Sequence, residues 1–78
     1  MSTIKVINHT AEAIHVSITM SSEYVEDKSE EWRDLAAHGG SNTWGRKHKQ
    51  VIRFTRSLTP GVLVETVLGV PGTTVDIY

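Results

Sequence analysis

Regular alternation of apolar and polar side chains is the feature that most limits what this sequence can fold into. Ile14, Val16, Ile18 and Met20 are separated by a polar side chain at each intervening position. Successive side chains of an extended strand point to opposite faces, so the pattern predicts a strand with one face in a core and the other toward solvent. Residues 14–20 are therefore expected to form a half-buried strand.

Six further segments have the composition of short strands, and turn residues separate them. Paired glycines at 39–40 and the proline–glycine pairs at 60–61 and 71–72 are strong turn signals. Strands with turns at such close spacing predict an all-β fold, a small antiparallel β-sandwich or barrel of about 6–7 short strands forming a single domain over residues 1–78. The further expected strands are 3–7, 31–35, 42–46, 50–56, 62–70 and 74–78.

The polar, acidic segment between the second and third expected strands has no apolar residues at helical spacing. Residues 21–30 contain only Tyr24 and Val25 as large apolar interruptions. We therefore expect a loop there, with a single helical turn beginning near Ser21 or Ser22 as the alternative.

The small size of the chain limits how it can be stabilised. A domain of 78 residues buries only roughly 60% of its unfolded surface, so its core is thin. The chain has no cysteine, which excludes disulfides and any cysteine-based zinc site. Self-association remains as the additional source of stability. Residues 62–70 are apolar on both faces and form the strand that a second subunit would cover. We therefore expect a homo-oligomer.

Charge and hydropathy patterns argue against several classes of partner. The formal net charge is −1, with acidic residues concentrated in residues 23–34 and basic residues in residues 46–56. Such a balance gives no general attraction to nucleic acid, which is not an expected partner. No signal-peptide pattern and no apolar run of about 20 residues occurs, so we expect a cytoplasmic protein and find no direct support for membrane interaction.

The residue types needed for catalysis are scattered. Cysteine is absent, no G-x-S-x-G motif occurs, and the four histidines fall in separate turns and on one strand face. His38, His48 and Asp34 match no recognised metal-ligand spacing. We expect no enzymatic activity, no catalytic residues, no metal and no cofactor.

One polar and aromatic segment has the composition of a carbohydrate site. Sugar recognition uses a flat aromatic face beside amide, hydroxyl and charged groups. In residues 38–46, Trp44 would be the platform, and His38, Asn42 and Arg46 would bind hydroxyls. Trp32, flanked by acidic residues, is the second candidate platform. The alternative for both tryptophans is a place in the core.

Two functions follow from these features. The first is a non-enzymatic, lectin-like module that binds a glycan through His38, Asn42, Trp44, Arg46 and Trp32 and acts as a homo-oligomer. The alternative is a structural or assembly protein without a small ligand, which self-associates through the apolar strand at residues 62–70.

Overall fold

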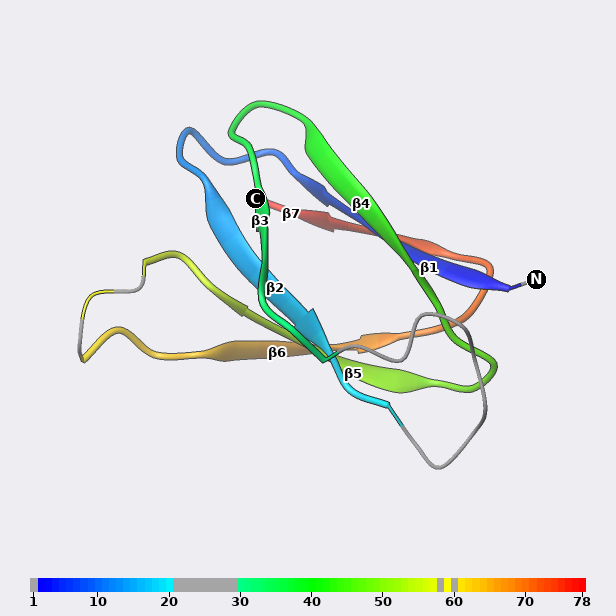
Figure 1. Cartoon of the computed structure of the whole chain (residues 1–78). Coiled ribbons are helices and arrows are strands. Elements are labelled where there is room, and N and C mark those ends of the chain that lie inside the picture. The colour runs from blue at the N-terminus through cyan, green and yellow to red at the C-terminus, as the bar shows by residue number, and fades with distance from the viewer. Residues whose placement is uncertain (1, 21–29, 58, 60) are drawn as a thin grey trace.

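Seven strands form two sheets that lie face to face in the computed structural model of the chain (Figure 1). The structure describes residues 2–20, 30–57, 59 and 61–78. A three-stranded sheet has the order β4-β1-β7, and a four-stranded sheet has the order β3-β2-β5-β6. The strands are β1 (Thr3–Asn8), β2 (Ile14–Ile18), β3 (Arg33–Leu35), β4 (Gly40–Gly45), β5 (Gln50–Thr55), β6 (Glu65–Gly69) and β7 (Thr74–Ile77).

The all-β, sandwich-like fold expected from the alternation is confirmed. Each expected strand is present, although the strands expected at residues 31–35 and 62–70 begin only at Arg33 and Glu65, and the strand expected at residues 14–20 ends at Ile18. The loop expected at 21–30 falls almost entirely on residues 21–29, outside the described residues. Across the part of the chain that the structure describes, nothing qualifies as a membrane-spanning helix.

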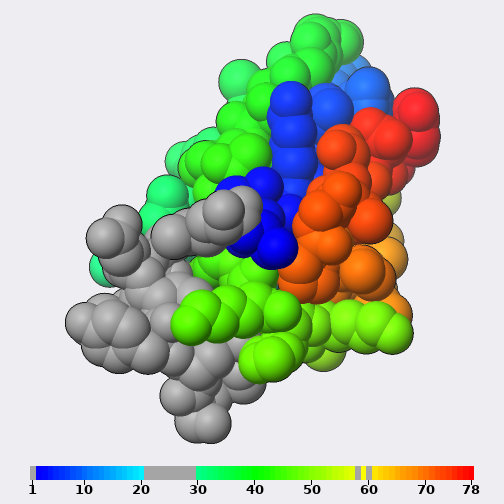
Figure 2. Space-filling model, turned by 90° about the vertical axis from the view of Figure 1, so that its right-hand side faces the viewer, coloured from blue at the N-terminus to red at the C-terminus, as the bar shows by residue number. Residues whose placement is uncertain are grey.

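One strand pairing differs from the expected antiparallel arrangement. β1 and β7 are parallel, with Lys5 opposite Thr74 and Asn8 opposite Ile77. The chain passes from β6 in one sheet to β7 in the other through residues 70–73, beside the start of β1, where Gly72 N donates to Thr3 O at 2.7 Å. β7 therefore starts at the same end as β1 and runs in the same direction. Figure 2 shows β1 between β4 and the C-terminal strand.

The core lies between the sheets and is built from the inward-facing side chains that the alternation predicts. Cross-strand partners share a face, so Ile18 beside Ile52 and Val16 beside Phe54 form one wall of the core. Trp44 beside Ile4 belongs to the opposite wall. The buried apolar side chains are Ile4, Val6, Ile14, Val16, Ile18, Leu35, Trp44, Ile52, Phe54 and Ile77.

A buried asparagine closes one end of the sandwich. Asn8 Nδ2 lies 2.8–3.0 Å from the carbonyl oxygens of Glu12, Leu35 and Ala36, and Asn8 Oδ1 accepts from Thr10 N at 2.9 Å. These contacts join the β1–β2 connection to the end of β3. Asn8 is fully buried and its amide is occupied, so the Asn8-His9-Thr10 sequence is a structural turn.

Candidate interaction surface

The structure places Trp44 in the core. Its side chain is 0% exposed, and its Nε1 has no hydrogen-bond partner among the described residues. Trp44 faces inward because it pairs with Ile4 across β1 and β4, both of which turn that face toward the four-stranded sheet. A sugar ring cannot stack on it in this fold, so the Trp44 platform considered from the sequence is absent from the surface.

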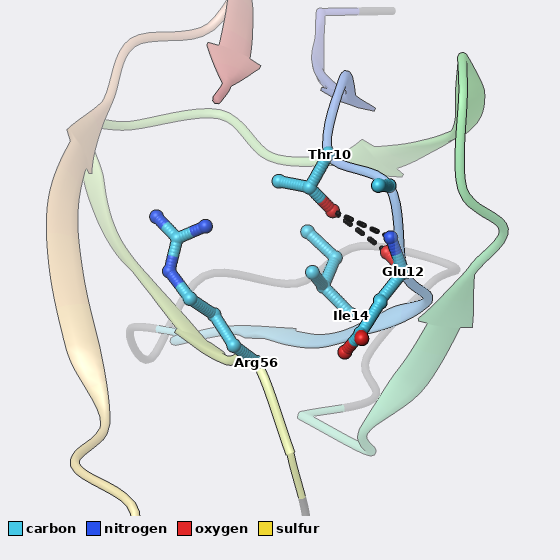
Figure 3. A pocket seen from close by; sticks show the side chains of 5 residues that line it. Thr10, Glu12, Ile14 and Arg56 are labelled. Atoms are coloured by element: carbon cyan, nitrogen blue, oxygen red, sulfur yellow. Dashed lines mark hydrogen bonds between the residues drawn. The ribbon is translucent and has the colours of Figure 1, made fainter.

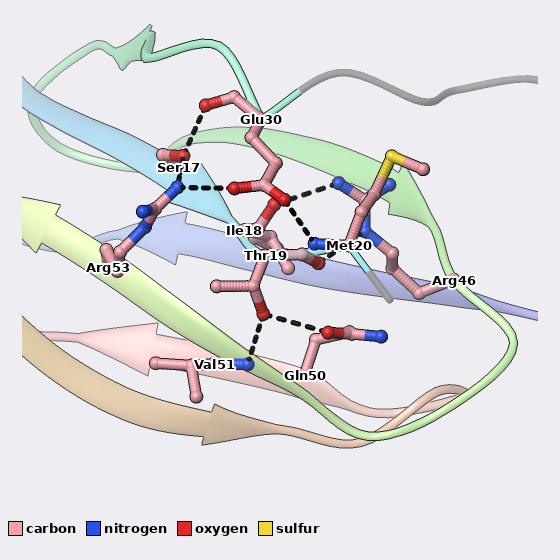
Figure 4. A network of polar contacts seen from close by, with 9 residues as sticks. All are labelled: Ser17, Ile18, Thr19, Met20, Glu30, Arg46, Gln50, Val51 and Arg53. Atoms are coloured by element: carbon pink, nitrogen blue, oxygen red, sulfur yellow. Dashed lines mark hydrogen bonds and ion pairs between the residues drawn. The ribbon is translucent and has the colours of Figure 1, made fainter. Parts of the chain in front are cut away.

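Arg46, the second residue of the expected site, is also fully buried. Its Nε donates to Thr19 O at 3.0 Å, its Nη1 to Gly45 O at 2.7 Å and its Nη2 to Ile18 O at 3.0 Å. Arg46 thus connects the end of β4 to the end of β2 (Figure 4). Its fork of donors satisfies backbone carbonyls where the strands end, which is a structural role.

The remaining expected ligand residues do not converge. His38 is exposed in the β3–β4 turn at one end of β4, and Asn42 is half-buried in mid-strand with its Oδ1 accepting from Thr43 N at 2.8 Å. Arg46 follows the other end of this six-residue strand, about 20 Å away at the usual rise per residue. Trp32 precedes β3 in the opposite sheet and is 45% exposed.

Trp32 is the expected platform residue that does reach solvent. The guanidinium carbon of Arg53 lies 5.8 Å from the centroid of the Trp32 ring, a cation–π contact. Arg53 Nη2 also donates to Ser17 Oγ at 2.7 Å and to Glu30 Oε1 at 3.1 Å. Trp32 is therefore held against the outward face of the four-stranded sheet.

A pocket at the Asn8 end of the sandwich is too small for a typical organic ligand. It has a volume of about 230 Å³ and is lined by Thr10, Ala11, Glu12, Ile14 and Arg56 (Figure 3). Small-molecule sites usually occupy about 300–1,000 Å³. Two of the polar groups that line the pocket already form hydrogen bonds within the protein. Thr10 Oγ1 donates to Glu12 O and Arg56 Nε donates to Glu65 Oε2, both at 2.7 Å.

Two histidine–aspartate pairs are present, but neither is completed into a catalytic triad by the described residues. His15 Nδ1 lies 2.5 Å from Asp34 Oδ1, and Ser17 shares the face of β2 that carries His15. The Ser17 hydroxyl donates to Glu30 O at 2.5 Å, so its hydrogen is not directed at a base. Among the described residues, no group of three metal-ligating side chains occurs.

Among the described residues, the exposed aliphatic side chains gather on β6 and the segments beside it. We define the β6 surface as six exposed side chains, of which Leu63 is 81% and Leu68 57% exposed. Large aliphatic side chains that are exposed together in one region of a protein often mark an interaction site. The β6 surface comprises Val51, Val62, Leu63, Val64, Val67 and Leu68.

β6 is exposed on both of its faces because the two sheets differ in width. Val67 shares the inward face with Ile52, yet it is 38% exposed, and Leu68 shares the outward face with Val51. Only the Gly69 end is covered: a Cβ added to Gly69 would lie 3.0 Å from atoms of Ile4 and Ile52. The rest of β6 extends beyond the three-stranded sheet along the lower edge of the molecule (Figure 1).

The other sheet edges carry features that discourage strand addition. β3 has three residues and carries exposed Asp34, and β7 has four residues and carries Asp76, which pairs with His9 at 2.8 Å. The exposed side chains of β4 are polar, namely Ser41 and Thr43. Short length and charge are the usual protection of an edge. β6 carries one charge, Glu65, whose Oε2 accepts from Arg56 Nε at 2.7 Å.

The apolar residues on both faces of the segment 62–70 are the sequence feature from which this surface could be predicted.

Comparison of the chain with protein-family models, with curated proteins and with solved structures found no match.

Proposed function

We propose that this chain is a non-enzymatic assembly protein that associates with further copies of itself through the β6 surface. The observation that carries the proposal is the exposure of aliphatic side chains on both faces of an edge strand. Burying such side chains removes apolar area from water at roughly 25 cal/mol per Å². β6 is also an edge strand among the described residues, and its edge offers backbone donors and acceptors that a further strand satisfies.

The thin core supports the same conclusion. Within the described part of the chain, ten apolar side chains form the buried cluster, and the sequence contains no cysteine that could cross-link it. Contact with another copy stabilises the folded state by mass action, because only the folded chain presents the β6 surface.

The test is the effect of Leu68→Lys on the state of association. We expect wild type to sediment as an oligomer and Leu68→Lys to weaken association about 30-fold or more, equivalent to about 2 kcal/mol, because a charge replaces an apolar contact at the seam. Analytical ultracentrifugation over a range of concentrations measures both. Thr43→Lys, which adds the same charge to an exposed position on another edge strand, is the matched control and should leave association unchanged.

A wild-type chain that is monomeric at every concentration would contradict the proposal. Equal weakening by Leu68→Lys and Thr43→Lys would also contradict it, because a general charge effect would then explain the result.

Carbohydrate binding is the second candidate function, and one observation favours it: Trp32 exposes an aromatic surface beside Arg53 and Glu30. Aromatic stacking with flanking polar groups is the chemistry of sugar recognition. On a glycan array, Trp32→Ala should lose the binding of wild type, whereas Tyr78→Ala, which removes an exposed aromatic side chain elsewhere, should retain it. Binding that Trp32→Ala leaves intact would remove Trp32 from this role.

A further inference from the structure

We propose that the partner at the β6 surface is a second copy whose β6 pairs antiparallel with the first about a two-fold axis at Val67, so that two four-stranded sheets join into one sheet of eight strands. This inference rests on the proposed function. It adds the strand direction, the register and a closed dimer as the product.

Exposure on both faces of β6 favours edge-to-edge pairing over packing of one face. Val67 is exposed on the inward face, and Leu68 and Val51 are exposed on the outward face. A partner stacked on one face would leave the other exposed. A strand added beside β6 brings side chains alongside both faces and pairs its free backbone groups.

Charge selects the strand direction. A parallel pairing in register would place Glu65 beside Glu65 of the partner subunit, and like charges directly opposite are destabilising. The antiparallel register places Glu65 opposite Gly69 of the partner subunit. Gly69 pairs with Gln50, which follows the exposed basic residue Lys49. Opposite charges therefore fall at the same end of the seam.

The remaining pairs in this register are free of like-charge contacts. Val67 lies opposite Val67 of the partner subunit, and Thr66 lies opposite Leu68 of the partner subunit. Val and Thr suit paired strands because their β-branched side chains pack well on a pleated surface. Val64, which precedes β6, then falls opposite Val70 of the partner subunit, just beyond the end of the partner's β6, and adds exposed apolar surface to the seam.

The two-fold symmetry determines both the number of copies in the assembly and the side on which the outward faces of the sheets lie. A two-fold contact uses the same surface on both copies and closes after two, so it produces a dimer and not a fibre. An axis between antiparallel strands of one sheet is perpendicular to that sheet. The outward faces of both four-stranded sheets therefore lie on one side of the dimer, each with its Trp32–Arg53 contact. Any ligand of that face would meet two equivalent sites.

Single cysteines in this cysteine-free chain test the register directly. Val67→Cys should oxidise to a disulfide-linked dimer, seen as a band of twice the mass on a non-reducing gel, because residues directly opposite lie within disulfide reach. Thr66→Cys alone and Leu68→Cys alone should remain largely monomeric on the gel. An equal mixture of Thr66→Cys and Leu68→Cys should cross-link, since these two positions face each other across the seam.

The mixture also protects the test against a folding defect in Val67→Cys, because Thr66 and Leu68 are both exposed. A dimer in sedimentation that cross-links through Thr66→Cys alone as readily as through Val67→Cys would overturn the register while leaving self-association intact. A wild-type monomer at all concentrations would overturn both. A monomer that sediments with phosphatidylcholine vesicles would also overturn both and assign the β6 surface to a membrane.

Discussion

At the scale of single residues, two buried polar side chains hold opposite ends of the sandwich. Asn8 lies opposite Gly40, at one end of the β1–β4 ladder, and Arg46 follows Gly45 at the other. The two amide hydrogens of Asn8 are shared among three backbone carbonyls within 3.0 Å, and Arg46 donates one hydrogen bond from each of its three nitrogens to a backbone carbonyl. A buried carbonyl without a donor costs about 1–3 kcal/mol, so both side chains are expected to contribute strongly to stability.

Replacement of Arg46 should therefore destabilise the fold. Arg46→Met keeps much of the side-chain length but removes three donors to the carbonyls of Ile18, Thr19 and Gly45. We expect a loss of about 3 kcal/mol or more in the free energy of unfolding, measured by urea denaturation.

Arg46→Lys should lose less free energy of unfolding than Arg46→Met, because the lysine ammonium still donates hydrogen bonds. It should still be less stable than wild type, because it lacks the planar fork of donors. Lys49→Met, at an exposed position close by, is the control and should unfold at the wild-type midpoint. A wild-type midpoint for Arg46→Met would show that these hydrogen bonds contribute little to the stability of the fold.

At the scale of strands and turns, backbone geometry limits which residues the β3–β4 connection can accept at positions 38–40. His38 and Gly39 both have positive φ angles, of 58° and 108°. Gly40 is restricted for another reason: a Cβ there would lie 2.4 Å from Ala36 O. The second glycine of the pair is thus required by close approach, and the first by backbone conformation.

Replacement by alanine should therefore reduce the free energy of unfolding by different amounts at Gly39 and at Gly40. Gly40→Ala should lose about 3 kcal/mol or more, because the added methyl meets backbone that has to move. Gly39→Ala should lose about 1 kcal/mol, because nothing lies within 4 Å of its Cβ and only the positive φ is unfavourable. Thermal or urea unfolding of both variants measures the difference. Equal losses, or a greater loss for Gly39→Ala, would contradict the close contact with Ala36.

At the scale of the whole molecule, the unequal width of the two sheets determines which strand remains exposed to solvent. Three strands cannot cover four, and the uncovered strand is the most apolar edge. The side of the sandwich with β6 therefore differs in chemistry from the sides bounded by β3, β4 and β7. The proposed two-fold assembly depends on this difference, because a two-fold contact uses the same surface on both copies.

Much of this architecture could be predicted from the sequence because side-chain alternation is local. The face of β2 that carries Val16 and Ile18 is buried as predicted, whereas Ser17, on the face expected to meet solvent, is also buried. The turns fall at Gly39 and at Pro71-Gly72. The site residues were harder to predict. The polar surroundings of Trp44 are consistent with either a ligand platform or a core position, and only the opposing sheet distinguishes the two.

The sequence by itself determined that the chain forms short strands, which side chains share a face, and that residues 62–70 have no polar face to offer solvent. Tertiary structure alone decided that Trp44 and Arg46 lie inside, that β7 joins β1 in parallel, and that β6 is the strand left uncovered. The physical reason is that alternation depends only on neighbouring residues. Burial depends instead on which strands, distant in sequence, come to lie opposite one another.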